Sequence, residues 1–226
     1  MTIKYLTFDC YGTLIDWKKG IESNFVASFA GGVTSNLDDI FSKYVTLESA
    51  LEGDYMPYKD ILRITSQKLA TSLGLPSSEQ AGEQFAASIV RWPAFGDTRF
   101  ALEKLGKLGY KKIILSNIDR DLLRSTIANN RLEIDDFITA EDVGSYKPNK
   151  KHWEYLFKKF GVERGEVIHV ACSLYHDITP ASELGLTTVW VNRYRDKQPA
   201  DVKPSFTIER LTDLTDVLGS LGSRTG

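Results

Sequence analysis

Short apolar runs that alternate with helical segments constrain the fold of this chain more than any other feature of its sequence. Five runs are rich in Ile, Val and Phe without alternating strictly, at residues 3–8, 112–115, 137–139, 167–171 and 188–191. Such runs are typical of parallel strands that are buried on both faces. Helical patterns lie between them at residues 98–108, 119–132 and 151–160. We therefore predict an α/β fold with a Rossmann-like, doubly wound parallel sheet.

The interval after the first run breaks this alternation, because no strand pattern occurs between Asp16 and Pro93. Amphipathic helices are predicted there instead, at residues 40–53, 58–74 and 77–92. Gly53 and Gly74 are typical of helix ends. The chain is therefore predicted to form an α/β core domain from residues 1–15 and 94–226, with a helical domain inserted at residues 16–93.

Composition and charge argue against several classes of partner. The 28 basic and 30 acidic residues nearly balance, without a long run of one sign, so nucleic acid and an anionic membrane are not expected partners. No apolar stretch approaches the roughly 20 residues of a membrane span, and the N-terminus lacks the layout of a signal peptide. Cys10 and Cys172 lie in strand-like apolar stretches, which favours a reducing compartment. We expect a soluble, cytoplasmic protein.

Polar residues follow the predicted strands at the point where each strand ends. In chain order these residues are Asp9, Cys10, Tyr11, Gly12, Thr13, Ser116, Asn117, Lys147, Tyr175, His176 and Asp177. Ligands of an open α/β sheet bind beyond the carboxyl ends of its strands. We therefore expect these side chains to converge on one site.

Four of these segments resemble, in the same order, the four motifs of the haloacid dehalogenase (HAD) superfamily of hydrolases. They are Asp9-Cys10-Tyr11-Gly12-Thr13-Leu14, Ser116-Asn117, Lys147-Pro148 and Asp177. The helical insert resembles the cap domain of that family, so the resemblance covers nearly the whole chain. It implies the HAD fold, with Asp9 as a carboxylate nucleophile, and a homodimer as a possible assembly.

Two positions separate this chain from the phosphatases of the superfamily. Tyr11 stands where phosphatases carry a second Asp, and Cys172 stands where they usually carry an acidic metal ligand. Mg²⁺ prefers oxygen ligands, so a thiol at this position weakens such a site. Tyr at the second position resembles the L-2-haloacid dehalogenase branch, in which Asp displaces a C2 substituent of a small carboxylic acid. Water then hydrolyses the ester. This implies a small carboxylate substrate, with neither metal nor cofactor.

Longer segments resemble a subgroup of this branch that includes L-azetidine-2-carboxylate hydrolase, which opens a strained ring. They are residues 92–95, 139–148 and 173–177. The resemblance implies either a halide or a ring amine as the displaced group. The arginine that is proposed to hold the halide in dehalogenases aligns with Lys43. A Ser and an Asn of their fourth motif become Cys172 and Leu174, and a Tyr of their third becomes Trp153. These replacements alter the halide site and the water-positioning site.

Each predicted role has a physical reason. A carboxylate such as Asp9 is a modest nucleophile that needs a nearby cation and a dry site, and Lys147 is the obvious cation. Backbone amides of the turn from Cys10 to Gly12 can hold the substrate carboxylate or an oxyanion. The remaining candidates are Ser116 and Asn117 as donors, Thr13 as a partner of Asp9, Asp177 as a partner of Lys147 or of a water, and Tyr11, Lys43, Tyr175 and His176 as lining residues.

Structural roles are the alternative for many of these residues. Ser116, Asn117 and Asp177 can cap helices, His169 lies inside a strand, and Trp17 and Tyr58 are expected to pack rather than to contact a ligand. Two other functions also stay open. One is a Mg²⁺-dependent phosphatase acting on a small phosphoester, and the other is a non-catalytic binding protein with the same fold.

Overall fold

A six-stranded parallel sheet forms the centre of the molecule, in a computed structural model that describes residues 3–29 and 35–222. The strand order is β3-β2-β1-β4-β5-β6. The strands are β1 (Tyr5–Phe8), β2 (Lys111–Ser116), β3 (Asp136–Thr139), β4 (Val167–Ala171), β5 (Thr187–Val191) and β6 (Phe206–Ile208). The α/β class is thus confirmed. The sequence pattern missed β6, because a strand of three residues is too short to show a period.

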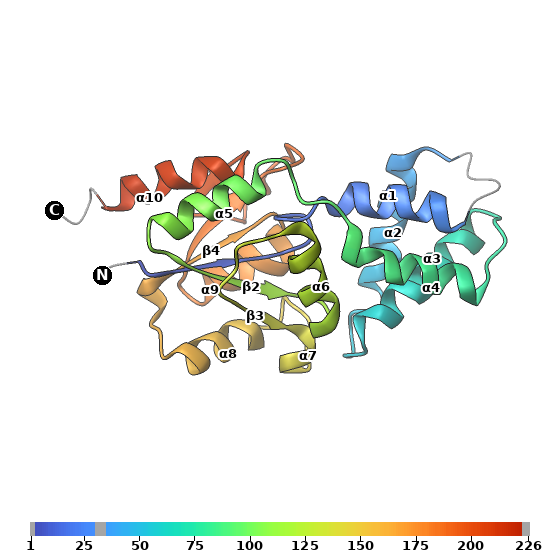
Figure 1. Ribbon diagram of the computed structural model, residues 1–226, viewed down its shortest axis with the longest axis horizontal. Coiled ribbons are helices and arrows are strands. Elements are labelled where there is room, and N and C mark those ends of the chain that lie inside the picture. Colours follow the sequence, from blue (N-terminus) through green and yellow to red (C-terminus); the bar gives the residue numbers. More distant parts are fainter. Residues whose placement is uncertain (1–2, 30–34, 223–226) are drawn as a thin grey trace.

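Helices cover both faces of the sheet. On one face lie α5 (Thr98–Lys107), α6 (Arg120–Asn130) and α10 (Leu214–Gly222), and on the other lie α8 (Lys151–Phe160) and α9 (Thr179–Glu183). Figure 1 shows α5 and α10 above the sheet and α8 below it. Along β2, Ile114 packs toward the first group, whereas Ile113 and Leu115 pack toward Trp153 of α8. Burial on both faces explains why the strands read as unbroken apolar runs.

Short helical segments complete the core. They are α7 (Ala140–Val143), the 3₁₀ turns η2 (Arg164–Glu166) and η4 (Leu211–Asp213), and the π-helical turn η3 (Leu174–Ile178). Two residues connect the end of β4 to the turn η3, which contains Asp177. The fourth motif therefore lies on a structured segment near the strand end.

The inserted segment is helical. It contains α1 (Trp17–Ser28), α2 (Leu37–Ser49), α3 (Tyr58–Ser72), α4 (Glu79–Ser88) and the 3₁₀ turn η1 (Ile89–Arg91). The sequence pattern did not indicate α1, whose buried positions are only Gly20, Ile21 and Phe25. Gly20 lowers helix propensity, but a Cβ here would lie 2.3 Å from Trp92. Close packing against that indole therefore requires glycine.

The cap formed by these helices lies at one end of the core, opposite α10 and the beginning of β1 (Figure 1). The two segments that connect the core to the cap run side by side, because Asp16 N–H donates to Pro93 O at 2.8 Å and Phe95 N–H donates to Leu14 O at 3.0 Å. On the core, Asp119 accepts bonds from the N–H groups of Tyr58 and Lys59, both at 2.9 Å, and so caps the first turn of α3. None of the described helices is both long and apolar enough to cross a membrane.

Candidate active site

The loop that follows β1 fixes Asp9 at the end of the sheet. Its N–H donates to Val170 O of the neighbouring strand at 3.1 Å. The chain then turns at Gly12, whose φ of +94° favours glycine. The Thr13 hydroxyl donates to Asp9 Oδ2 at 2.7 Å and accepts the N–H of Cys172 at 2.8 Å. Thr13, itself bound by the backbone after β4, therefore orients one oxygen of Asp9.

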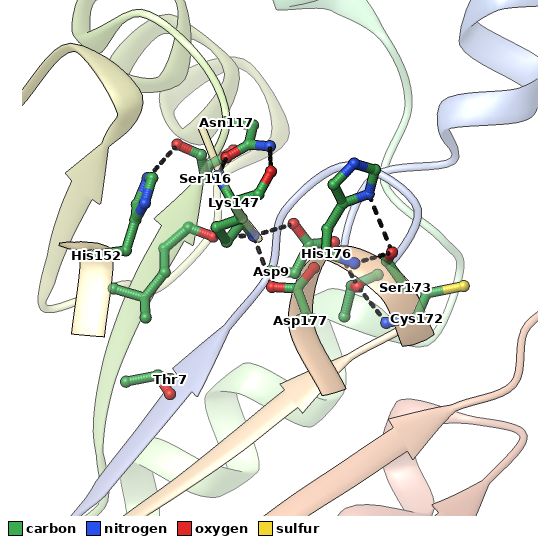
Figure 2. Close-up of polar contacts among 12 residues, drawn as sticks. Thr7, Asp9, Ser116, Asn117, Lys147, His152, Cys172, Ser173, His176 and Asp177 are labelled. Carbon is green, nitrogen blue, oxygen red and sulfur yellow. Dashed lines mark hydrogen bonds and ion pairs between the residues drawn. The ribbon is translucent and has the colours of Figure 1, made fainter. Parts of the chain in front are cut away.

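Lys147 binds the other oxygen of Asp9 from a buried position. Its Nζ donates to Asp9 Oδ1 at 2.9 Å, to Asp177 Oδ1 at 2.7 Å and to Leu115 O at 2.8 Å. Figure 2 shows the ammonium group between the two carboxylates. All three of its donors are used, and only 1% of the side chain is exposed. The first, third and fourth motifs thus meet at one ammonium group.

The electrostatics of this cluster favour the charged forms of Lys147 and Asp177. For Lys147, burial alone would lower the pKa, but the charges of Asp177 and Asp9 raise it above its ordinary value. For Asp177, burial acts upward, yet Lys147 and the hydrogen bond from His169 lower the pKa to about 2. Burial raises the pKa of Asp9, and Lys147 offsets part of this rise. A permanent cation therefore lies between the two carboxyl groups.

His169 on β4 forms a buried hydrogen-bond contact with Asp177. Its Nε2 lies 3.0 Å from Asp177 Oδ1, and its Nδ1 lies 2.9 Å from the Thr7 hydroxyl. The parallel register places Thr7 opposite His169 on the neighbouring strand. Sequence reasoning gave His169 only a structural role. A histidine at a fully buried strand position is a polar group that needs a partner, which is the signal for such a contact.

A cavity of about 480 Å³ opens above Asp9 between core and cap. Predicted site residues that line it are Asp9, Tyr11, Gly12, Ser116, Asn117, Lys147, Tyr175, His176 and Asp177. On the cap side it is lined by Trp17, Phe41, Val45, Glu48, Ser49, Glu52 and Tyr58. Trp17 and Tyr58, which were expected to pack, thus also border the cavity. The period of an amphipathic helix identifies its apolar face but not the cavity that this face borders.

The placement of Lys43 corrects a sequence expectation. Lys43 is exposed and is not among the described residues that line the cavity. The lining face of α2 carries Phe41, Val45 and Glu48, which are spaced four and three residues apart. A residue two positions from Phe41 lies on a different face of the helix. Lys43 therefore lies outside this cavity, away from the position that the alignment with the dehalogenase arginine predicts.

The other residues of the first loop agree only in part with the sequence prediction. The Cys10 side chain is fully buried, so only its backbone can reach the cavity. The Gly12 N–H already donates to Ile15 O at 2.8 Å, which removes it as an oxyanion donor. Among the described hydrogen bonds, the N–H groups of Cys10 and Tyr11 have no acceptor. The Tyr11 hydroxyl lies 2.7 Å from the Thr126 hydroxyl on α6, so the ring rather than the hydroxyl borders the cavity.

The second motif supports the third. The Asn117 side chain accepts the Lys147 N–H at 2.7 Å and donates to the Lys147 carbonyl at 3.0 Å. Both ends of its amide are therefore engaged with the backbone and brace Lys147, while the second hydrogen of the NH2 group can still serve the predicted role of a substrate donor. The Ser116 side chain is buried at the cavity edge, while its carbonyl lies 3.2 Å from His152 Nε2.

Two glutamates, Glu48 and Glu52, line the cavity on its cap side, here called the cap wall. The Tyr58 hydroxyl donates to Glu48 Oε1 at 2.5 Å. Burial, followed by the charge of Glu52, raises the pKa of Glu48 to about 8. Glu52 Oε2 lies 3.2 Å from His176 Nε2, and His176 Nδ1 lies 3.2 Å from the Ser173 hydroxyl. Neither glutamate was singled out from the sequence, because charged positions on an amphipathic helix normally face solvent.

The residues at the cavity floor do not fit a carboxylate-rich magnesium site. Cys172 stands at the expected acidic position, and Asp177 Oδ1 is already bound by Lys147 and His169. Over the described ranges, no three His, Cys, Asp or Glu side chains are grouped so that they could hold a metal ion.

Comparison with known proteins identifies the family. The model of haloacid dehalogenase-like hydrolases matches residues 3–185, so the chain belongs to this family of hydrolases. It is 26% identical over 231 residues to the (S)-2-haloacid dehalogenase of Pseudomonas fluorescens, a match that covers 96% of both proteins. The structure of the L-2-haloacid dehalogenase from Xanthobacter autotrophicus has the same fold, with a TM-score of 0.86 at 20% identity over 97% of this chain and 100% of that one.

A shorter match points to another activity within the superfamily. Over 89 residues the chain is 35% identical to the glyceraldehyde 3-phosphate phosphatase of Methanocaldococcus jannaschii. This match covers 38% of this chain and 39% of that protein. The full-length similarity to dehalogenases therefore extends over the cap, whereas the phosphatase similarity does not span the chain.

Proposed function

We propose that this protein is a metal-independent hydrolase that displaces a substituent from C2 of a small 2-substituted carboxylic acid. The observation that carries the proposal is Asp9 at the floor of a cavity, with one oxygen bound by Thr13 and the other by Lys147. Tyr11 and Cys172 at the two positions that distinguish phosphatases support it, as does the full-length similarity to 2-haloacid dehalogenases.

The proposed reaction has two steps. An Asp9 oxygen attacks C2, the bond from C2 to the substituent breaks, and the substituent leaves with the electron pair. Water then attacks the carboxyl carbon of the resulting aspartyl ester and releases a 2-hydroxy acid. The charge of Lys147 favours the ionised form of Asp9, and the N–H groups of Cys10 and Tyr11 are our candidates for binding an oxyanion. The leaving group is a halide or, as in azetidine-2-carboxylate, a ring amine.

Single-turnover labelling in ¹⁸O water tests the ester. With enzyme in excess over (S)-2-chloropropionate or L-azetidine-2-carboxylate, we expect ¹⁸O in the Asp9 side chain, detected by peptide mass spectrometry. Asp9→Asn should abolish turnover, and chelators should leave it unchanged. Asp39→Asn, an exposed change on the cap, is the matched control. Label that enters the product directly, with none in the protein, would contradict the ester route.

A phosphatase is the second candidate, because the shorter match to a phosphatase favours it. Magnesium-dependent release of phosphate from a panel of small phosphoesters, lost on chelation, would support this function instead. Binding without turnover of any panel member would indicate a non-catalytic protein. From the family resemblance we also propose a homodimer in the cytoplasm, for which sedimentation of the purified protein tests the assembly.

A further inference from the structure

The second step of the proposed reaction needs a group that takes a proton from water, and Asp177 is poorly suited to this. Its Oδ1 accepts bonds from both Lys147 and His169, which hold its pKa near 2. A general base works best when its pKa lies near the operating pH. Asp177 is therefore better suited to holding Lys147. The Ser and Asn of the dehalogenase fourth motif are Cys172 and Leu174 here, so the chain lacks those partners for water as well.

Three other side chains that line the same cavity are connected in a row. The Ser173 hydroxyl lies 3.2 Å from His176 Nδ1, and His176 Nε2 lies 3.2 Å from Glu52 Oε2. Figure 2 shows Ser173 and His176 beside Asp9 and Asp177, at the same end of the sheet. A carboxylate at Nε2 favours a proton on that nitrogen and leaves the lone pair of Nδ1 facing Ser173. The order is that of a Ser-His-acid triad, with the two ring nitrogens exchanged.

The backbone fixes this arrangement. Ser173 precedes the turn η3, and its hydroxyl oxygen accepts the His176 N–H at 3.0 Å. A hydroxyl group can accept and donate at the same time, so the hydrogen of Ser173 can still be donated to the histidine ring. His176 is 29% exposed at its side chain, whereas Glu52 is 13% exposed. The imidazole is thus open to water on one side and anchored by a shielded carboxylate on the other.

We propose that His176, oriented by Glu52, is the general base of ester hydrolysis and accepts a proton from the attacking water through the Ser173 hydroxyl. This inference rests on the proposed function, since it concerns the fate of the Asp9 ester. The water oxygen bonds to the Asp9 carboxyl carbon while its proton passes to His176. The bond from this carbon to the substrate oxygen then breaks, and the departing alkoxide takes the proton from His176. Asp9 is left as a carboxylic acid, which releases its remaining proton to solvent and so returns to the carboxylate.

The base is built from both domains. Glu52 follows α2 of the cap, whereas Ser173 and His176 belong to the core loop after β4. Glu52 and His176 are 124 residues apart in the sequence. The acid partner of the base is therefore present only when cap and core are together, which links ester hydrolysis to a closed cavity.

Rapid-quench kinetics with (S)-2-chloropropionate separate the two steps. For His176→Gln we expect ester formation to persist while hydrolysis slows about 100-fold, the effect of a lost general base. The ester then accumulates and is detected as added mass on the peptide that contains Asp9. For Glu52→Gln we expect hydrolysis to slow about tenfold, since the base remains but loses its orienting partner. Imidazole added to His176→Gly should restore part of the hydrolysis rate.

Asp54→Asn is the matched control, because Asp54 is an exposed acidic residue two positions beyond Glu52. Both steps should keep the wild-type rate in this variant. Equal slowing of ester formation and hydrolysis in His176→Gln would overturn the assignment, as would wild-type hydrolysis in that variant. If an ester forms in the wild type and the variants hydrolyse it normally, only His176 is excluded. If no ester forms in any protein, the proposed function fails and the assignment falls with it.

Discussion

The floor of the cavity carries Asp9, Lys147 and Asp177, and its cap wall carries Glu48 and Glu52. The two regions differ in how their charged groups are held. On the floor, Lys147 donates all three of its hydrogen bonds inside the protein, and Asp9 and Asp177 are both bound by it. On the wall, Trp17, Phe41 and Tyr58 line the cavity together with Glu48 and Glu52, of which Glu48 is bound by Tyr58 and Glu52 lies beside His176. The floor is preorganised for one kind of displacement, whereas the wall determines which molecule fits above it. Changes to the floor should thus lower kcat, and changes to the wall, apart from Glu52 with its proposed part in hydrolysis, should mainly raise KM.

Lys147→Met should produce the largest effect. It leaves two buried carboxyl groups without their cation, so we expect the free energy of unfolding to fall by about 3–5 kcal/mol. Turnover should fall on the order of 100- to 1000-fold, because the nucleophile loses its electrostatic support. Urea unfolding and steady-state kinetics measure both. Lys150→Met, at a partly exposed lysine that pairs with Glu183, is the control and should change stability by less than about 1 kcal/mol. Unchanged stability in Lys147→Met would show that the floor is not held by this cation.

The pH dependence of stability reports on the wall. The pKa of Glu48 is about 8 in the folded protein and ordinarily 4.5, so the folded state keeps a proton that the unfolded state releases between these values. The free energy of unfolding should therefore fall as pH rises from 4.5 to about 8, by at most about 1.4 kcal/mol per pH unit from this group. Glu48→Gln should remove that contribution, measured by urea unfolding across this range. A slope that is the same in Asp39→Asn and in Glu48→Gln would contradict the assignment.

Tyr58→Phe should give the smallest effect. It removes the hydroxyl that donates to Glu48 and leaves the ring in place. We expect KM to rise about two- to fivefold with kcat unchanged, which corresponds to the loss of one hydrogen bond. Tyr55→Phe is the matched control, because Tyr55 is partly exposed and does not line this cavity. A fall in kcat without a change in KM would place Tyr58 with the floor instead.

Sequence reasoning predicted the floor far better than the wall. The first five strands of the chain were predicted within two residues at each end, because strands buried on both faces are continuous apolar runs. The helix α1 and the strand β6 were not, since a narrow apolar stripe and a three-residue strand give little periodic signal. His169 was found only with the structure, because its role depends on Thr7 of the neighbouring strand.

By itself, the sequence determined that Asp9, Lys147 and Asp177 lie at the same edge of the sheet. Each follows a strand, and parallel strands end on one side, so the order of segments suffices to bring these groups together. Only the tertiary structure decided that α2 turns Glu48 toward the cavity and Lys43 away from it, and that Glu52 lies beside His176. A helical period shows which residues share a face, but the docking of the cap on the core determines what that face meets.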